Sequence, residues 1–312
     1  MTISQDSISL STQFGIGGSV QQFLWRYQGQ TFPVTYEILG QGSPVLLLPA
    51  FSTVSTRAEM QGLAERLAPH FQVFAFDWLG FGQSARPSLD YQRSLYQALL
   101  QNFVSEIFDA PVAVIAAGHA AGYVMQLAAQ PPFPWSRIAL VAPTWRGPLP
   151  TMGASASVAG MVRGLVRSPL IGQALYQLNT TPSFLSWMYR RHVYTDATKL
   201  TPEFIEHKHQ ITQQPGARFA PAAFVTGALD PATTRDEFLA WFQGLSVPVM
   251  VVIGEQAPPK SRAEMEALAE LPAVQINRLP GTLGMHEEYA AEVAEAVLPF
   301  LDVSINHHFS DL

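Results

Sequence analysis

The chain has 312 residues, 48% of them hydrophobic, so it is long and apolar enough to bury a sizeable core and does not read as a disordered protein. Its formal net charge of -6, without a run of lysine or arginine, disfavours a phosphate backbone as partner, and we expect no nucleic-acid binding. The lack of cysteine excludes disulfides, thiolate nucleophiles and cysteine-ligated metals.

The sequence carries no signal for membrane insertion or export. Residues 1–18 lack a basic region followed by an apolar stretch, and no run of about 18 apolar residues occurs anywhere. We therefore expect a cytoplasmic protein without a leader or a transmembrane segment. No pattern indicates an oligomeric state.

Apolar runs alternate with segments of helical spacing along most of the chain. The runs predict buried strands at residues 44–51, 71–78, 110–118, 135–143, 247–255 and 273–281. Apolar residues three or four positions apart predict helices between and after them: Met60, Leu63 and Leu67; Leu95, Leu99, Phe103 and Ile107; Tyr289, Val293, Val297 and Leu301. Nearly continuous apolar strands that alternate with helices predict a parallel sheet covered on both faces.

The alternation stops after Pro143 and resumes at residue 247, and the segment between suits a mostly helical insertion. In it, residues 201–203 (Thr-Pro-Glu) are typical of a helix start with an N-cap, a first-turn proline and an early acid. Residues 261–264 (Ser-Arg-Ala-Glu) predict a capping box at the start of a later helix. Residues 158–178 place two arginines among apolar residues; we expect a buried helix, with peripheral contact to a membrane as the alternative.

Four landmarks in chain order carry a family resemblance: "LLLPAF" (46–51), "DWLGFGQS" (77–84), "GHAAG" (118–122) and "LPGTLGMHEE" (279–288). Together they resemble the α/β-hydrolase superfamily, in the branch with a helical cap, over roughly residues 23–301. The resemblance implies an α/β fold with a mostly parallel central sheet flanked by helices and a helical cap inserted after the sixth strand. It implies a first core part at residues 1–145, a cap at 146–240 and a second core part, with the histidine loop and final helix, at 241–312.

The chemistry of that family needs a nucleophile on a strained strand-to-helix turn, a histidine that moves its proton and a carboxylate that orients the histidine. By resemblance, the nucleophile position is Ala120, the general base is His286 and the acid position is Ala257. Neither alanine carries a reactive group. Glu255, two residues before the vacant acid position, is a candidate substitute acid, and Ala120 is expected to keep the strained backbone of the turn.

The oxyanion hole of the family consists of main-chain N–H groups, which the resemblance assigns to Phe51 and Ala121. Pro49 and Ala50 stand where many relatives have His-Gly. No cofactor is expected, and no metal, because His207 and His209 are two positions apart on a predicted helix and point to different faces.

Other polar residues near these landmarks have a structural interpretation. His119 is expected to pack or hydrogen-bond beside the elbow, Asp77 to hold its turn, and Asp230 to belong to a turn or a helix cap. None of the three is expected to be a member of a triad.

The missing nucleophile has two interpretations. The chain is either a natural, catalytically silent relative of ester hydrolases that binds an apolar small molecule under the cap, or an active serine carboxylic-ester hydrolase in which Ala120 is an engineered replacement for serine. One substitution explains Ala120 but explains neither Ala257 nor the Pro49-Ala50 pair. The sequence therefore favours natural loss of the covalent mechanism.

Overall fold

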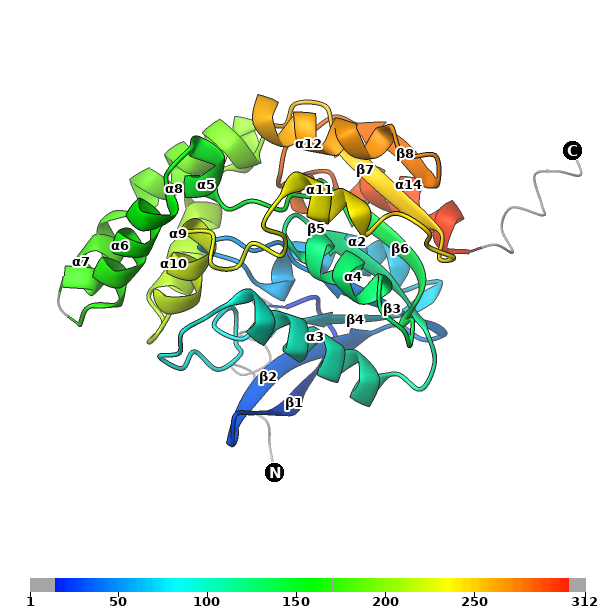
Figure 1. The fold of residues 1–312 in the computed structure, drawn as a ribbon, viewed down its shortest axis with the longest axis horizontal. Helices are drawn as coiled ribbons and strands as arrows, with labels where there is room; N and C mark the ends of the chain where they lie inside the picture. Colours follow the sequence, from blue (N-terminus) through cyan, green and yellow to red (C-terminus); the bar gives the residue numbers. More distant parts are fainter. Residues whose placement is uncertain (1–14, 170, 303–312) are drawn as a thin grey trace, which may run out of the picture.

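The computed structural model describes residues 15–169 and 171–302, and its centre is one eight-stranded sheet (Figure 1). The strand order is β1-β2-β4-β3-β5-β6-β7-β8; β2 pairs antiparallel with β1 and β4, and the neighbours from β4 to β8 run parallel. The predicted mostly parallel α/β sheet is confirmed. The strands are β1 (Ser19–Tyr27), β2 (Gln30–Leu39), β3 (Ser43–Leu48), β4 (Phe71–Phe76), β5 (Val112–Ala117), β6 (Trp135–Val141), β7 (Val249–Gly254) and β8 (Val274–Leu279).

The hairpin of β1 and β2 is an element that the sequence pattern did not predict. Gln28 and Gly29 connect the strands with φ values of 48° and 77°, which is the two-residue loop that matches the twist of paired strands. Most residues of β1 are exposed, and only Phe23 and Trp25 are buried. The hairpin therefore covers one edge of the core with two aromatic side chains. Residues 1–14, in which we expected no leader, and residues 303–312 lie outside the described residues.

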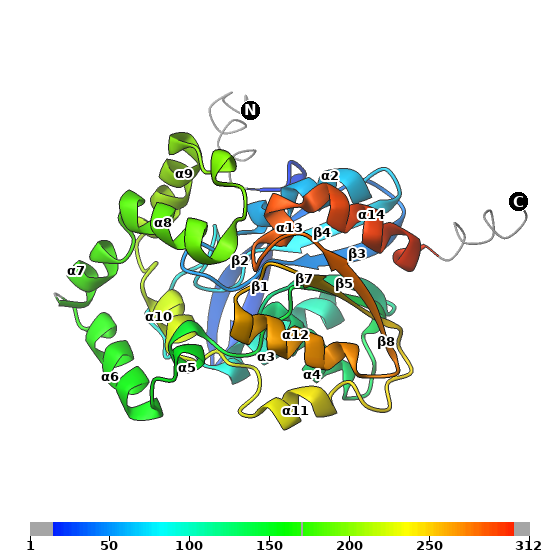
Figure 2. The ribbon, with the colours of Figure 1, turned by 90° about the horizontal axis from the view of Figure 1, so that it is seen from above.

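Helices cover both faces of the sheet, with α2 and α14 on one side and α3, α4 and α12 on the other (Figure 2). These elements are η1 (Arg57–Met60, a 3-10 helix), α2 (Gln61–Leu67), α3 (Arg93–Ile107), α4 (Ala120–Ala128), α11 (Arg235–Ala240), α12 (Pro259–Ala269), α13 (Met285–Glu288) and α14 (Ala290–Leu301). The predicted capping box at residues 261–264 is wrong. The helix α12 begins three residues earlier than a Ser261 N-cap implies, after Pro258, and its N-cap has no side-chain hydrogen bond.

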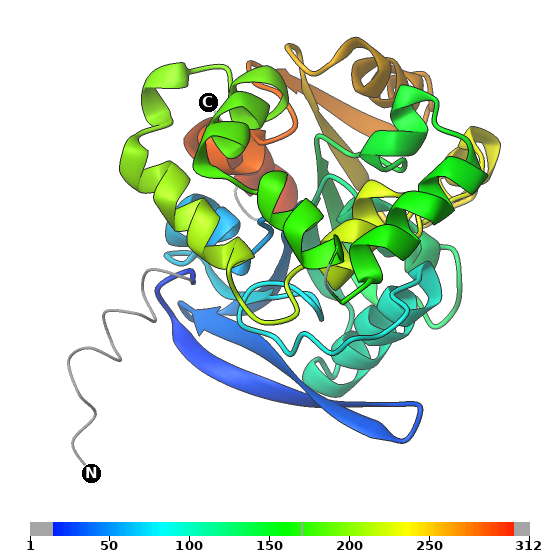
Figure 3. The ribbon, with the colours of Figure 1, turned by 90° about the vertical axis from the view of Figure 1, so that its left-hand side faces the viewer.

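Between β6 and β7 the chain leaves the sheet and builds the helical cap, which lies in front of the core in Figure 3. The cap elements are α5 (Pro148–Met152), α6 (Ala156–Arg167), α7 (Ile171–Leu178), α8 (Pro182–Met188), η2 (Tyr189–Val193, a π-helical turn), η3 (Ala197–Lys199), α9 (Pro202–Thr212) and α10 (Phe219–Val225). The predicted N-cap is confirmed, since the Thr201 hydroxyl accepts the Phe204 N–H at 3.2 Å.

The expectation of a buried helix at residues 158–178 is wrong. Ala159 is the only buried residue described in α6, and Gly172 and Tyr176 are the only ones described in α7. A second small apolar cluster joins the cap to the loop after β3; it is formed by Val54 of that loop and by Leu185, Tyr189, Tyr194, Leu200 and Ile205 of the cap. The helices α8 and α9 pack against each other around it, and α6 and α7 lie farther out (Figures 1 and 2).

Candidate active site

The turn between β5 and α4 lies at the carboxyl edge of the sheet, where ligands of open α/β sheets bind. The strand ends at Ala117, Gly118 has a φ of +52°, and α4 begins at Ala120. The expectation that Ala120 would be held in a strained conformation is wrong. Among the described residues only Gln28 and Ala142 are non-glycine residues with positive φ, and Ala120 is a fully buried residue of the first helical turn. The left-handed residue of this turn is Gly118.

Because residue 118 is glycine, the turn has no side chain at its left-handed position at the carboxyl edge of the sheet. A Cβ built there would lie 3.0 Å from the Cβ of Ala50, in the loop after β3, and 3.8 Å from the Oγ1 of Thr144, in the loop after β6. The space where a residue at the turn would project is therefore bounded by a methyl group and a hydroxyl group.

Main-chain N–H groups beside the turn differ in whether they already have an acceptor within the protein. The N–H of Ala121 donates to the carbonyl of Gly118 at 3.2 Å, so it is not free for an oxyanion. Among the main-chain hydrogen bonds of the described residues, none uses the N–H of His119 or of Phe51. Phe51, one of the two expected donors, and His119, but not Ala121, therefore have main-chain N–H groups without a main-chain acceptor among the described residues.

His119 connects the turn with two loops. Its Nδ1 lies 2.9 Å from Thr144 Oγ1, its Nε2 lies 3.1 Å from Asp230 Oδ1, and the ring is 1% exposed. Because a carboxylate only accepts, Nε2 is assigned as the donor to Asp230, and in the tautomer that carries its proton there Nδ1 accepts the threonine hydroxyl. The same Asp230 oxygen accepts the Gly147 N–H at 2.7 Å. A hydroxyl, an imidazole and a carboxylate therefore stand in one hydrogen-bonded row, which the sequence interpretation of His119 and Asp230 missed.

The vacant acid position lies after β7. Ala257 is buried, and its N–H donates to the carbonyl of Gly254 at 3.1 Å. The side chain of Glu255 is exposed and takes part in none of the side-chain hydrogen bonds or ion pairs of the described residues that involve His286. The structure therefore does not bring Glu255 to the histidine.

His286 lies in α13, between the last strand and the last helix, and is 3% exposed. Its Nε2 faces Glu59 Oε2 at 3.4 Å, whereas its buried Nδ1 has no partner among the described residues. Lys208 of the cap lies 3.7 Å from Glu59 Oε1 and 2.8 Å from Glu287 Oε1. The carboxylate that holds His286 is thus Glu59 of η1, a residue that the sequence did not single out.

The cap is bound tightly to the segment that carries His286. The carboxylate of Glu288 accepts the Thr195 N–H at 2.9 Å and the Asp196 N–H at 2.7 Å, and Lys199 donates to the Glu288 carbonyl at 2.7 Å. These charge-assisted bonds fix η2 and η3 of the cap to α13.

Aromatic rings form an apolar wall behind the turn. The ring of Phe51 stacks on Trp78 with centroids 4.7 Å apart and contacts Tyr96 and Tyr123 edge-on or tilted at 5.0 and 5.6 Å. Burial raises the pKa of both tyrosines well above the ordinary value, so they stay protonated and donate to main-chain carbonyls. From the cap side, Phe224 meets the His119 ring edge-on at 5.0 Å.

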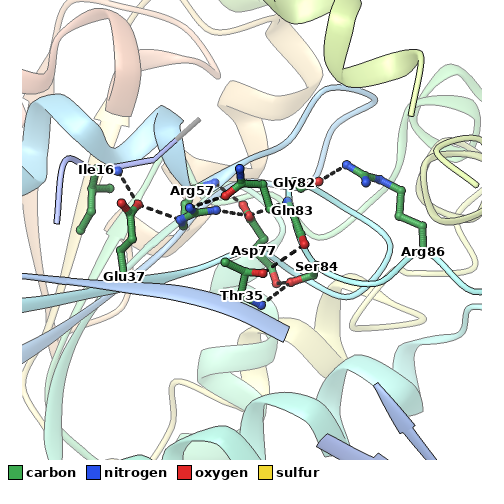
Figure 4. A network of polar contacts seen from close by, with 9 residues as sticks. All are labelled: Ile16, Thr35, Glu37, Arg57, Asp77, Gly82, Gln83, Ser84 and Arg86. Atoms are coloured by element: carbon green, nitrogen blue, oxygen red, sulfur yellow. Dashed lines mark hydrogen bonds and ion pairs between the residues drawn. The ribbon is translucent and has the colours of Figure 1, made fainter. Parts of the chain in front are cut away.

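A buried polar network supports the loops after β3 and β4 (Figure 4). The guanidinium of Arg57 donates to Glu37 Oε2 and to Gln83 Oε1, both at 2.7 Å, and also pairs with Asp77. Asp77 further accepts the N–H groups of Arg57 and Gln83, and its carbonyl accepts the Ser84 hydroxyl at 2.7 Å. Because all its acceptors are occupied by the protein, Asp77 has the structural role that its turn motif predicts.

A cavity of about 270 Å³ lies beside this network, under the carboxyl-terminal end of α9. The hydroxyl of Thr56, which lines it, is buried without a partner, and Arg86, which also lines it, forms no ion pair with any described residue. A larger hollow of about 570 Å³ lies at β1 and α3, away from the carboxyl edge of the sheet. The smaller cavity is lined by Thr56, Gly82, Gln83, Arg86, Ile211 and Gln214.

A parallel sheet with a strand-to-helix turn after β5 and a helical cap after β6 defines the class of α/β-hydrolase-fold proteins. The sequence profile of the alpha/beta hydrolase family matches residues 45–296, and the chain belongs to that family. Part of the chain is similar to an uncharacterized protein of Mycobacterium tuberculosis, with 32% identity over 106 residues that make up 34% of this chain and 30% of that protein. The match therefore spans less than a third of that relative's length.

Solved structures of the same fold include enzymes. An enol-lactonase from Burkholderia xenovorans is 17% identical, with a TM-score of 0.66 over 86% of this chain and 96% of that chain. A thermophilic esterase from Thermogutta terrifontis is 19% identical, with a TM-score of 0.68 over 91% of this chain and 98% of that chain. At these identities the similarity shows the fold alone.

The described residues show neither a membrane-spanning helix nor a metal-binding cluster. No helix within residues 15–169 and 171–302 is long and apolar enough to cross a membrane. In the same part of the chain, no group of three or more histidine, aspartate or glutamate side chains is arranged to hold a metal ion.

Proposed function

We propose that this chain does not form a covalent acyl intermediate at the β5–α4 turn and instead binds a small molecule at the carboxyl edge of the sheet, beneath the cap. The observation that carries the proposal is the conformation of Gly118, the residue of the turn with positive φ. In related hydrolases the nucleophile projects from such a turn. Glycine places no atom there that can attack a carbonyl carbon.

The other two parts of the mechanism also depart from the family pattern, because the acid position after β7 is vacant and the histidine pairs with a carboxylate of η1. Ala257 has no carboxylate, and His286 faces Glu59 with its second nitrogen unpartnered. Covalent acyl transfer needs nucleophile, base and orienting acid in one hydrogen-bonded row. These departures support natural loss of the mechanism over a single engineered substitution.

The site keeps features that suit a ligand. The N–H groups of Phe51 and His119, which have no main-chain acceptor among the described residues, can donate to a carbonyl or carboxylate oxygen, and the packed rings around Phe51 make the surroundings apolar. Arg86 and the unpartnered Thr56 hydroxyl in the adjacent cavity suit an acidic group. We therefore propose an apolar ligand with a carbonyl or carboxylate group, which agrees with structural relatives named as an esterase and an enol-lactonase.

The first experiment tests for covalent chemistry. The chain and its Ala120→Ser and Gly118→Ser variants are incubated with a fluorophosphonate, and covalent labelling is read by intact mass. Hydrolysis of 4-nitrophenyl butyrate by the same three proteins is measured separately. We expect no labelling and no turnover above the buffer rate for the chain as it stands. Ala120→Ser is also expected to be silent because residue 120 is fully buried in α4. Activity that appears in Ala120→Ser would restore the engineered interpretation.

The second experiment tests for binding. Octanoate is expected to raise the melting temperature of the chain in a saturable way, and octane-1,2-diol serves as an apolar control without a carboxylate. The Arg86→Gln variant is expected to weaken the octanoate effect at least tenfold, since it removes the charge that meets the carboxylate. No stabilisation by octanoate would contradict the binding proposal.

A second candidate function follows from the row of Thr144, His119 and Asp230. Thr144 is partly exposed, and its hydroxyl lies 2.9 Å from an imidazole that is oriented by a carboxylate. This candidate function is ester hydrolysis with threonine as nucleophile. Thr144 Oγ1 attacks the ester carbonyl while His119 Nδ1 takes the hydroxyl proton, and His119 then protonates the departing alkoxide. Water hydrolyses the threonine ester. Fluorophosphonate labelling at Thr144, lost in Thr144→Val, would favour this function over silent binding.

A further inference from the structure

The outer helices of the cap expose apolar side chains in stripes. In α6, Val158, Met161 and Leu165 are 48%, 67% and 43% exposed, and they follow the i, i+3, i+7 spacing of one helix face. In α7, Ile171 and Leu178 are 59% and 68% exposed at positions i and i+7. A surface helix normally turns such a stripe toward the core. Here both stripes face solvent.

The cap carries most of the exposed large apolar side chains of the described chain. Of ten such side chains, seven lie in the cap between α5 and α8. Trp187 of α8 is 56% exposed, and Met152 at the end of α5 is 74% exposed. The helices α6 and α7 pack against each other at the outer end of the cap (Figures 1 and 3). A concentration of exposed apolar side chains of this kind points to an interaction site.

The charge of the same segment has one sign. Residues 148–195 contain four arginines and no aspartate or glutamate, although the chain as a whole has 24 acidic residues and a net charge of -6. Arg190 and Arg191 are exposed, and Arg167 is the only one of the four that forms an ion pair with a described residue, Asp90. The apolar face is therefore accompanied by positive charge on an otherwise acidic protein.

We infer that the outer cap, residues 148–195, is a peripheral docking surface for an anionic lipid bilayer. Exposed apolar side chains enter the boundary between headgroups and acyl chains, and arginines contact the lipid phosphates. Trp187 suits this boundary because its ring is apolar and its indole N–H is polar. The helices lie on the bilayer and do not cross it.

A second copy of the chain is the less suitable occupant. In a twofold dimer the same patch faces itself, so arginines of one copy would approach arginines of the other with no carboxylate of residues 148–195 to neutralise them. An anionic bilayer supplies the missing negative charge.

The test is co-sedimentation of the full chain with vesicles of phosphatidylcholine alone and of phosphatidylcholine mixed with phosphatidylglycerol. We expect binding to the mixed vesicles that weakens with added salt. Arg190→Gln/Arg191→Gln is expected to lower the partition coefficient about fivefold per arginine. Met161→Ser/Leu165→Ser is expected to lower it at least tenfold, through loss of apolar burial.

Matched controls lie outside the cap, on β1, the edge strand of the sheet. Leu24 is 62% exposed on β1, and Arg26 is an exposed arginine of the same strand. Leu24→Ser and Arg26→Gln are expected to leave vesicle binding unchanged, and circular dichroism and the melting temperature check that each variant is folded. Equal binding of all variants, or no binding to mixed vesicles, would overturn the inference. Self-association that Met161→Ser/Leu165→Ser abolishes, without vesicle binding, would assign the face to a second copy.

Discussion

The imidazole of His119 ties the β5–α4 turn to Asp230, a residue 111 positions away in the chain, through an Nε2 to Oδ1 distance of 3.1 Å. That carboxylate lies after α10, where the chain returns from the cap, and it also accepts the N–H of Gly147, where the chain enters the cap. One carboxylate thus joins the turn to both ends of the cap insertion.

Replacing Asp230 should therefore destabilise the protein even if no reaction occurs. Asp230→Ala leaves the buried His119 N–H and the Gly147 N–H without acceptors, and we expect the free energy of unfolding to fall by about 1–3 kcal/mol. Asp230→Asn keeps a carbonyl oxygen and should lose less. Urea unfolding measures the difference, with Asp109→Ala at an exposed position as control. If Asp230→Ala and Asp230→Asn lost the same free energy of unfolding, the hydrogen bonds that Asp230 accepts from His119 and Gly147 would contribute nothing to stability.

Arg57 is expected to be the most sensitive position of the polar network in Figure 4. Arg57→Met leaves the carboxylates of Glu37 and Asp77 buried without their shared cation, which should cost about 3–5 kcal/mol of stability. Arg66→Met, at an exposed arginine, should change stability by less than about 0.5 kcal/mol. Chemical denaturation of the two variants checks this contrast, and similar small losses for both would refute it.

Lys208 should make the stability of the protein sensitive to alkaline pH. Burial alone would lower the pKa of this ammonium group, but the carboxylates of Glu287 and Glu59 raise it above the ordinary value. Because the folded pKa is the higher one, the contribution is fully present below the unfolded value of about 10.4 and is lost as pH rises from there through the folded pKa. Above about pH 10 the chain should lose stability more steeply than Lys208→Met. If the free energy of unfolding fell in parallel with pH for the two proteins, the pairing of Lys208 with Glu287 and Glu59 would be contradicted.

Gly118 and Gly164 provide a matched pair for the backbone of the turn. Gly118→Ala forces a side chain onto a φ of +52° and within 3.0 Å of Ala50, so we expect a loss of about 1–2 kcal/mol. Gly164 lies in α6 with open space around its Cβ direction, and Gly164→Ala should stabilise by about 0.5–1 kcal/mol. Thermal unfolding of both variants gives the two signs, and a stabilising Gly118→Ala would show that the turn does not need glycine.

Much of the sheet was predictable because buried parallel strands need unbroken apolar runs, and β3 to β7 show them. The hairpin of β1 and β2 was missed because most of β1 is exposed and its apolar pattern is weak. The start of α12 was misplaced because Pro259, a good first-turn residue, lies before the apparent capping box.

The site was less predictable than the fold. The position of Ala120 in the motif suggested the turn, but which residue takes positive φ depends on where β5 ends and α4 begins. The pairing of His286 with Glu59 joins residues 227 positions apart, and no local pattern encodes such a contact. The division of the chain at residues 145 and 240 stays a prediction.

The bonds of Glu288 have a mechanical consequence for the cap. They fix the segment of Thr195 and Asp196 to the core, so a cap motion that leaves these bonds intact keeps this segment in place. The helices α6 and α7 lie at the outer end of the cap (Figure 2) and would sweep the widest arc. A force applied to these outer helices, such as adhesion to a surface, would therefore exert a larger torque on the base of the cap than the same force applied close to the core.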